Sequence, residues 1–173
     1  MPFSLTLKRA SRAVLLPAVV LLLALGGCSS AAVPVAEGSA ASSASGWTYT
    51  DDIGNTVTLD HVPAKVAGFT DQVLSLMSYG VKPVAVFGRT DVKSDTRFAD
   101  YDMTGVAITG NTYGEIDLEA LASAQPDLIV TGIYPTDRKG TIDKTQPYYG
   151  FKDLEQQKKL EAIAPIVTIK VGG

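Results

Sequence analysis

The segment that most constrains the fold is Glu115–Thr131, which has the pattern of a short helix followed at once by a buried strand. Asp117 is a good N-cap residue, because its short side chain can accept a hydrogen bond from a free backbone N–H of the first turn. Pro126 lacks the N–H that a continuing helix needs, so we expect the helix to end near Ala124. The apolar run Asp127–Val130 then predicts a strand covered on both faces, as in a parallel sheet.

Other short apolar runs alternate with helical segments along the chain, and we expect them to form strands at 66–69, 84–87, 106–108 and 166–169. Two shorter strands around Gly54-Asn55 predict a small hairpin ahead of them. This alternation predicts an α/β fold, specifically a Rossmann-like three-layer lobe with a mainly parallel central sheet, preceded by a small β-hairpin.

Two more helices are expected between these strands. The first has Asp71 as its N-cap, Val73 and Met77 on its apolar face and Gly80 as its stop. The second spans 151–163, with Phe151, Leu154 and Leu160 on its apolar side.

The first 27 residues are organised like an export signal, with a positive segment at Lys8–Arg12 and an apolar run at 13–25. Leu25-Gly26-Gly27-Cys28 resembles the lipobox of bacterial lipoproteins, which implies cleavage before Cys28 and attachment of diacylglycerol and further acyl chains such as palmitate. Two or three acyl chains would anchor the protein to the cell membrane on its extracytoplasmic face, at the cell surface or in a periplasm. The alternative for Cys28 is a lone buried thiol.

After the signal, residues 28–46 consist mainly of Ala, Ser, Gly and Pro, a composition that predicts a flexible tether. Loss of residues 1–27 leaves twelve basic against eighteen acidic residues, so we do not expect a nucleic acid partner. The rest of the chain, 47–173, is one domain, and a single cysteine permits no disulfide within it.

Five motifs occur along the folded part in a specific order and spacing, namely Tyr49–Gly54, Pro63–Val66, Tyr79–Val86, Asp117–Leu121 with Gln125–Val130, and Leu160–Val167. Together they resemble the N-terminal lobe of the periplasmic-binding-protein family that delivers ferric siderophores, haem or cobalamin to ABC importers. Members of that family have two lobes joined by a long helix, with the ligand between them. The chain ends where that helix would begin, so we expect the second lobe to be absent and 47–173 to be an incomplete N-terminal lobe.

The loops after parallel strands emerge at one edge of the sheet, where open α/β sheets bind their ligands. These loops carry five candidate ligand-binding residues, Thr70, Arg89, Tyr113, Tyr134 and Arg138. Arginine offers charged donors to carboxylate, catecholate or hydroxamate oxygens, and tyrosine adds flat apolar area with a polar tip. The other reading of these side chains is an ordinary solvated loop. Iron would arrive inside the chelate, so neither a cofactor nor a direct metal ligand is expected.

The resemblance also implies a role for Glu119, since the glutamate of the family's matching motif docks into an arginine pocket of the permease. The alternative is a first-turn acid that interacts favourably with the helix dipole.

Catalysis finds little support in this sequence. His61 is the single histidine, in a connector, and neither a Gly-x-Ser-x-Gly motif nor a phosphate-binding glycine loop occurs. One histidine also cannot supply a zinc ligand set. We therefore expect no enzyme, but a monomeric substrate-binding lipoprotein that captures ferric siderophore and delivers it to an ABC permease. The alternatives are haem or cobalamin import, a non-transport interaction module, and an anchored hydrolase.

Overall fold

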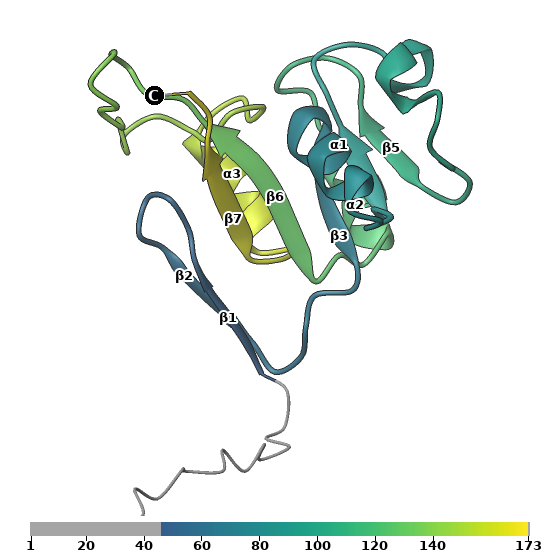
Figure 1. Cartoon of the computed structure of the whole chain (residues 1–173), viewed down its shortest axis with the longest axis horizontal. Coiled ribbons are helices and arrows are strands. Elements are labelled where there is room, and N and C mark those ends of the chain that lie inside the picture. The colour runs from purple at the N-terminus through teal and green to yellow at the C-terminus, as the bar shows by residue number, and fades with distance from the viewer. Residues whose placement is uncertain (1–45, 173) are drawn as a thin grey trace, which may run out of the picture. The chain divides into compact units, whose positions relative to one another are not determined.

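Five parallel strands form the centre of the structure, a computed structural model that describes residues 46–172 (Figure 1). Their order across the sheet is β5-β4-β3-β6-β7, and their bounds are Val66–Phe69 for β3, Ala85–Phe87 for β4, Ala107–Gly110 for β5, Leu128–Ile133 for β6 and Ile166–Lys170 for β7. The chain moves outward on one side from β3 to β5, then returns to the other side of β3 with β6. The predicted Rossmann-like parallel sheet is therefore confirmed, and its topological switch point lies between β3 and β6.

Helices cover both faces of this sheet, which gives the three predicted layers (Figure 1). On one face, helix α1 (Thr70–Ser78) packs Val73 and Met77 against strand residues such as Val86 and Val130. On the other face lie α2 (Leu118–Ser123) and α3 (Leu154–Glu161), whose buried residues Leu121 and Leu160 join a second core cluster that includes Ala67, Phe69, Ala85, Phe87 and Ile129. Because the central strands are apolar on both sides, they read in the sequence as continuous runs.

The predicted hairpin is also present, formed by β1 (Trp47–Thr50) and β2 (Thr56–Leu59). Its turn reaches the edge strand β7, where Asp51 Oδ2 accepts hydrogen bonds from Thr168 N at 3.2 Å and Thr168 Oγ1 at 2.7 Å. Asp52 Oδ2 accepts from Lys170 N at 2.7 Å. These carboxylates satisfy backbone donors that an edge strand would otherwise leave open.

The sequence predictions were wrong in part for three elements, β6, α1 and α3. β6 continues to Ile133, because residues 131–133 pair with residues 168–170 of β7. Asp71 is not an N-cap, since Phe69 occupies that position without a side-chain hydrogen bond and Asp71 lies in the first turn. α3 begins only at Leu154, after the N-cap Asp153, and Leu154 is exposed rather than on the apolar side.

The predicted signal segment, Cys28 and nearly all of the predicted tether lie in residues 1–45, outside the described residues. Between residues 46 and 172, the structure has no helix with the length and apolar character needed to cross a membrane.

Candidate functional site

The candidate site lies at the carboxyl ends of the strands, the upper edge of the sheet in Figure 1. β3 and β6 are neighbours and end at Phe69 and Ile133, so the loops that follow them begin side by side. The loop after β4 brings Arg89 to the same edge, and the loop after β5 brings Tyr113. We call this edge of the sheet, with its loops, the carboxyl edge.

Four aromatic rings pack together at the carboxyl edge around Tyr149. The ring centroid of Tyr149 lies 4.5 Å from that of Tyr134, 5.1 Å from that of Phe69 and 5.2 Å from that of Tyr113. We call Phe69, Tyr113, Tyr134 and Tyr149 the Tyr149 cluster. Phe69 is fully buried and forms its floor, whereas Tyr113 is 46% exposed and Tyr134 is 39% exposed. The cluster thus offers tilted aromatic faces and polar tips to a ligand from solvent.

Both backbone polar groups of Tyr149, its N–H and its carbonyl, form hydrogen bonds with residues of β6. Its N–H donates to the carbonyl of Gly132 at 3.0 Å, and its carbonyl accepts from the hydroxyl of the fully buried Thr131. Gly150 follows with φ +91°, and a Cβ there would lie 2.5 Å from the ring of Phe69. Tyr149 is a site residue that sequence reasoning missed, because it stands at the far end of a long loop and not directly after a predicted strand. The Tyr-Gly pair was the available signal.

Arg89 completes the cluster with a cation. Its guanidinium carbon lies 5.5 Å from the ring centroid of Tyr149 and 5.9 Å from that of Phe69, both within range of a cation–π interaction. The Arg89 side chain remains 46% exposed, so part of its donor set faces solvent. The structure therefore brings together Arg89, Tyr113 and Tyr134, three of the five predicted ligand-binding residues.

A second arginine joins Arg89 through a shared acid. Asp71 Oδ2 accepts from Arg89 Nη2 at 2.9 Å, and Asp71 Oδ1 accepts from Arg97 Nη1 at 2.8 Å. Arg97 also binds Asp95, with Nη2 to Oδ2 at 2.6 Å. We call Asp71, Arg89, Asp95 and Arg97 the Arg89 network. The hydrogen bond from Arg97 holds the pKa of Asp95 below its usual value, and the two acids raise the pKa of Arg97, so Asp95 and Arg97 are both charged at neutral pH.

Tyr134 is a neutral donor in this setting. Burial, together with the nearby charge of Asp71, raises the pKa of Tyr134 above its ordinary value near 10, although the charge of Arg89 opposes the shift. The phenol therefore keeps its proton at physiological pH and can donate it in a hydrogen bond.

The other two predicted ligand residues belong neither to the Tyr149 cluster nor to the Arg89 network. Thr70 opens α1 at the carboxyl edge but is only 3% exposed, and a Cβ on Gly88 would come within 2.7 Å of its methyl group. Its side chain is packed inside rather than presented to solvent. Arg138 is exposed on the loop beyond Tyr134, in an open depression of about 430 Å³ that Val171 also lines.

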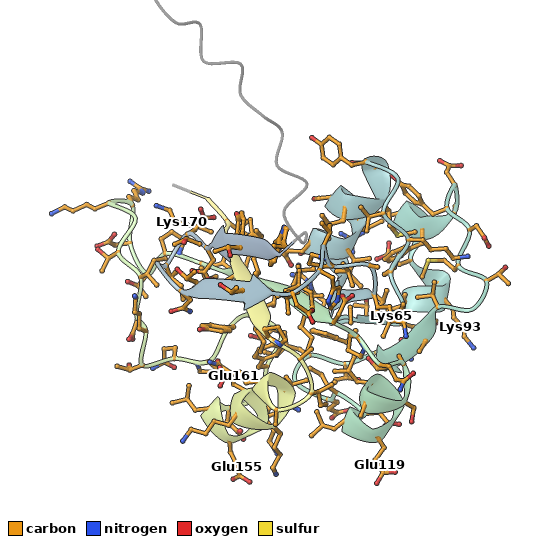
Figure 2. The ribbon with its side chains drawn as sticks, turned by 90° about the horizontal axis from the view of Figure 1, so that it is seen from below. Lys65, Lys93, Glu119, Glu155, Glu161 and Lys170 are labelled. Carbon is orange, nitrogen blue, oxygen red and sulfur yellow. The ribbon has the colours of Figure 1, made fainter. Side chains whose placement is uncertain are left out.

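Glu119, the predicted docking residue, is exposed in the first turn of α2. Asp117 caps this helix as predicted, since its Oδ1 accepts from Ala120 N at 2.9 Å. Figure 2 shows the Glu119 side chain projecting away from the ribbon. In residues 46–172 its carboxylate has neither a hydrogen-bond partner nor an ion-pair partner, so it is free to meet another protein.

His61 lies in a connector, as predicted, and makes two polar contacts. Its Nδ1 lies 2.5 Å from Asp60 Oδ1 and its Nε2 lies 3.3 Å from Asp127 Oδ2. Hydrogen bonds that the protonated ring donates to the carboxylates of Asp60, first, and Asp127 raise the pKa of His61. Asp127 also accepts from Ala64 N at 2.8 Å, so the group joins the connector to the start of β6. The described part of the chain contains no cluster of three or more His, Cys, Asp or Glu side chains that could hold a metal ion.

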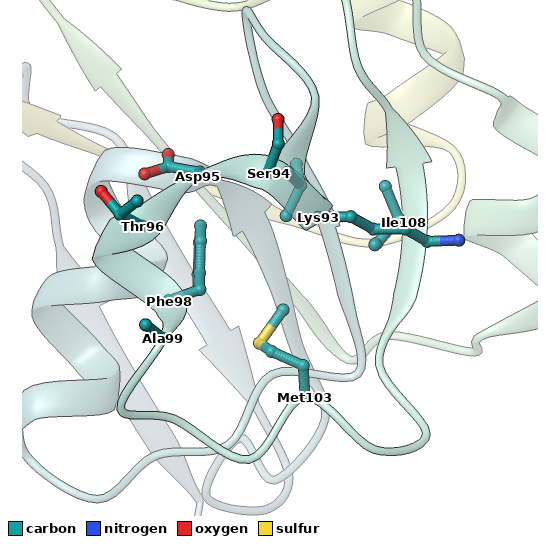
Figure 3. A pocket seen from close by; sticks show the side chains of 9 residues that line it. Lys93, Ser94, Asp95, Thr96, Phe98, Ala99, Met103 and Ile108 are labelled. Atoms are coloured by element: carbon teal, nitrogen blue, oxygen red, sulfur yellow. The ribbon is translucent and has the colours of Figure 1, made fainter.

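Two hollows lie beside the segment 92–98, which forms two short 3₁₀ turns, Val92–Ser94 and Thr96–Phe98. One is an apolar cavity of about 370 Å³ lined by Phe98, Met103 and Ile108 among others, and it contains none of the candidate ligand residues (Figure 3). The other is a polar depression of about 520 Å³ lined by residues of the Arg89 network and their neighbours. Asp95 lines both hollows, but Arg89 and Arg97 line only the second of the two.

No protein-family model matches the chain, and no match was found among curated proteins. Among solved structures, the chain is similar to DesE, a ferric-siderophore receptor protein from Streptomyces coelicolor, with 34% sequence identity and a TM-score of 0.57. The similarity covers 72% of this chain and 40% of the DesE chain.

Two further matches are the iron uptake ABC transporter substrate-binding protein PiuA from Streptococcus pneumoniae and the periplasmic catecholate-siderophore binding protein VctP from Vibrio cholerae, each 25% identical. PiuA has a TM-score of 0.47 over 70% of this chain and 36% of its own, and VctP a TM-score of 0.46 over 71% and 37%. Of these three, only DesE is similar enough to support an inference about the site. The chain spans about two fifths of the length of each of these proteins, and these structural neighbours are iron-uptake or siderophore-binding proteins.

Proposed function

We propose that this chain is a substrate-binding lipoprotein of an ABC importer and that its carboxyl edge forms one wall of a ferric siderophore site. The observation that carries the proposal is Arg89 stacked on the Tyr149 cluster at the topological switch point of the sheet. Ligands of open α/β sheets bind at that point. The similarity to DesE over most of the described chain supports the same assignment.

The chemistry of the edge suits an oxygen-rich chelate. A ferric siderophore surrounds Fe³⁺ with negatively charged oxygens and has a carbon backbone outside them. Arg89 and the phenol of Tyr134 supply donors for those oxygens, while the ring faces of Tyr113 and Tyr149 cover the carbon parts. The chelate satisfies the iron, so the protein needs no metal ligand of its own.

Two further residues connect the site to a membrane. Acyl chains on Cys28 would hold the protein at the extracytoplasmic face. Glu119, exposed and without a partner in the described chain, would contact arginine on the permease. Because both residues lie outside the Tyr149 cluster, loss of either should impair uptake and leave the binding of ligand intact.

The test is a titration of the full chain, purified in mild detergent, while tyrosine and Trp47 fluorescence is recorded. The ligands are a ferric trihydroxamate, a ferric triscatecholate, their iron-free forms, haem and cobalamin, with empty micelles as the control for partitioning. We expect saturable quenching by a ferric chelate and not by its iron-free form. Quenching by haem or cobalamin alone would favour those ligands instead. No response from a chain that circular dichroism shows to be folded would contradict the proposal.

A further inference from the structure

We propose that Asp71 sets the charge selectivity of the carboxyl edge and positions Arg89 there, an inference that rests on the siderophore-binding function proposed above. Asp71 lies in the first turn of α1, and its side chain is only 24% exposed. Its carboxylate meets Arg89 on one oxygen and Arg97 on the other. It is the one acid in the Arg89 network that contacts both arginines.

The first consequence concerns the position of Arg89. An arginine side chain is long and flexible, and close to half of this one is exposed to solvent. Asp71 holds one of its terminal nitrogens at 2.9 Å, and the rings of Tyr149 and Phe69 lie against its guanidinium carbon. The carboxylate and the two rings together restrain the guanidinium, so that its remaining donors point to solvent in a defined place.

Arg97 fixes Asp71 in turn. Arg97 holds Asp95 through both Nε and Nη2, at 2.9 and 2.6 Å, which is a two-point attachment. Its Nη1 remains for Asp71 at 2.8 Å. Asp95 is nearly buried, so the series of hydrogen-bonded side chains Asp95–Arg97–Asp71–Arg89 is held in place at its Asp95 end.

The second consequence concerns charge. The Arg89 network contains two cations and two anions, so its net charge is zero. The two other charged residues between 89 and 97 are Asp91 and Lys93, which also cancel. Arg89 therefore does not present an uncompensated positive charge. An anionic ligand that approaches Arg89 also approaches the carboxylate of Asp71.

This arrangement should discriminate between chelates by their charge. Three hydroxamates neutralise Fe³⁺, whereas three catecholates give a complex of charge −3. Near Asp71 the trianion is repelled and the neutral complex is not, while hydrogen bonding from Arg89 serves both. Removing the charge of Asp71 should therefore favour the trianion selectively, by roughly five- to tenfold at low ionic strength for a separation of about 10 Å.

The test measures dissociation constants of the full chain in detergent for a ferric trihydroxamate and a ferric triscatecholate by equilibrium dialysis with radio-iron. Asp71→Asn is compared with wild type and with Asp102→Asn. Asp102 is a matched control, since it pairs with Lys82 at 2.7 Å beyond the opposite end of α1. Asp71→Glu, which keeps the charge, serves as the second variant.

We expect Asp71→Asn to shift the ratio of the two constants toward the trianion by about five- to tenfold, and this shift should shrink in high salt. Asp102→Asn and Asp71→Glu should leave the ratio near that of wild type. A purely structural role would weaken both chelates by the same factor, so an unchanged ratio in Asp71→Asn would overturn the inference alone. Failure of wild type to bind either chelate would overturn the proposed function as well.

Discussion

Replacement of Gly150 by alanine should destabilise the fold through the Tyr149 cluster. Gly150 has φ +91°, and an alanine in such a conformation loses about 1 kcal/mol. The new Cβ would also lie 2.5 Å from Cδ2 of Phe69, which is fully buried, and overpacking of a core adds about 1–3 kcal/mol. Together these terms predict a loss of about 2–4 kcal/mol in the free energy of unfolding.

Gly80→Ala is the matched control for this substitution. Gly80 has φ +85°, but nothing lies within 4 Å of a Cβ built there, so only the conformational term of about 1 kcal/mol applies. For a folded unit of this size, unfolding entropy converts these losses into a melting temperature lowered by roughly 7–15 °C for Gly150→Ala and roughly 4 °C for Gly80→Ala. Circular dichroism of thermal unfolding measures both. Equal shifts in the two variants would refute the claim that Phe69 requires glycine at this position.

Three other predictions concern His61, the arginines Arg89 and Arg138, and Glu119. His61→Gln should destabilise the protein at low pH and have little effect at high pH. The reason is that the raised pKa of His61 contributes stability that is complete below the ordinary value near 6.5 and is lost as pH rises through the higher folded value. Denaturation midpoints from pH 5.5 to 8.5 test this, and a pH-independent difference would contradict the ion pairs of His61 with Asp60 and Asp127. Arg89→Met should weaken the binding of a ferric chelate by about tenfold or more and Arg138→Met by much less, as measured by dialysis; equal losses would show that the stacked guanidinium has no special role. Glu119→Ala should leave the affinity for the chelate unchanged while it lowers cellular iron uptake, and a large loss of affinity would contradict a docking role.

The elements of the sheet could be predicted because their signal is local. Buried parallel strands are apolar on both faces, so β3 and β4 appear as uninterrupted runs between turns. The end of β6 could not be predicted in this way, since Thr131 and Gly132 look like loop residues. They remain in the strand because β7 pairs with them. That pairing depends on a segment more than thirty residues away.

The candidate site was only partly predictable for the same reason. The rule for parallel sheets correctly placed Arg89, Tyr113 and Tyr134 at one edge. It could not reveal that the carboxylate of Asp71 binds two arginines instead of capping the helix, because Arg97 lies 26 residues further along the chain. Nor could it show Tyr149 as the centre of the cluster, since that position follows from contacts with β3, with β6 and with the loops after β4 and β5, rather than from its neighbours in the sequence.

If the Tyr149 cluster is a binding surface for ferric chelates, equilibrium dialysis of the full chain with a radio-iron siderophore should detect it. Tyr149→Ala is compared with Tyr79→Ala, which removes an 86% exposed tyrosine at the far end of α1. We predict saturable binding by wild type and by Tyr79→Ala, and binding weaker by about tenfold or more in Tyr149→Ala, because a stacked ring and its support for Arg89 are lost. Equal affinity of all three proteins for the chelate would show that the Tyr149 cluster is not the binding surface.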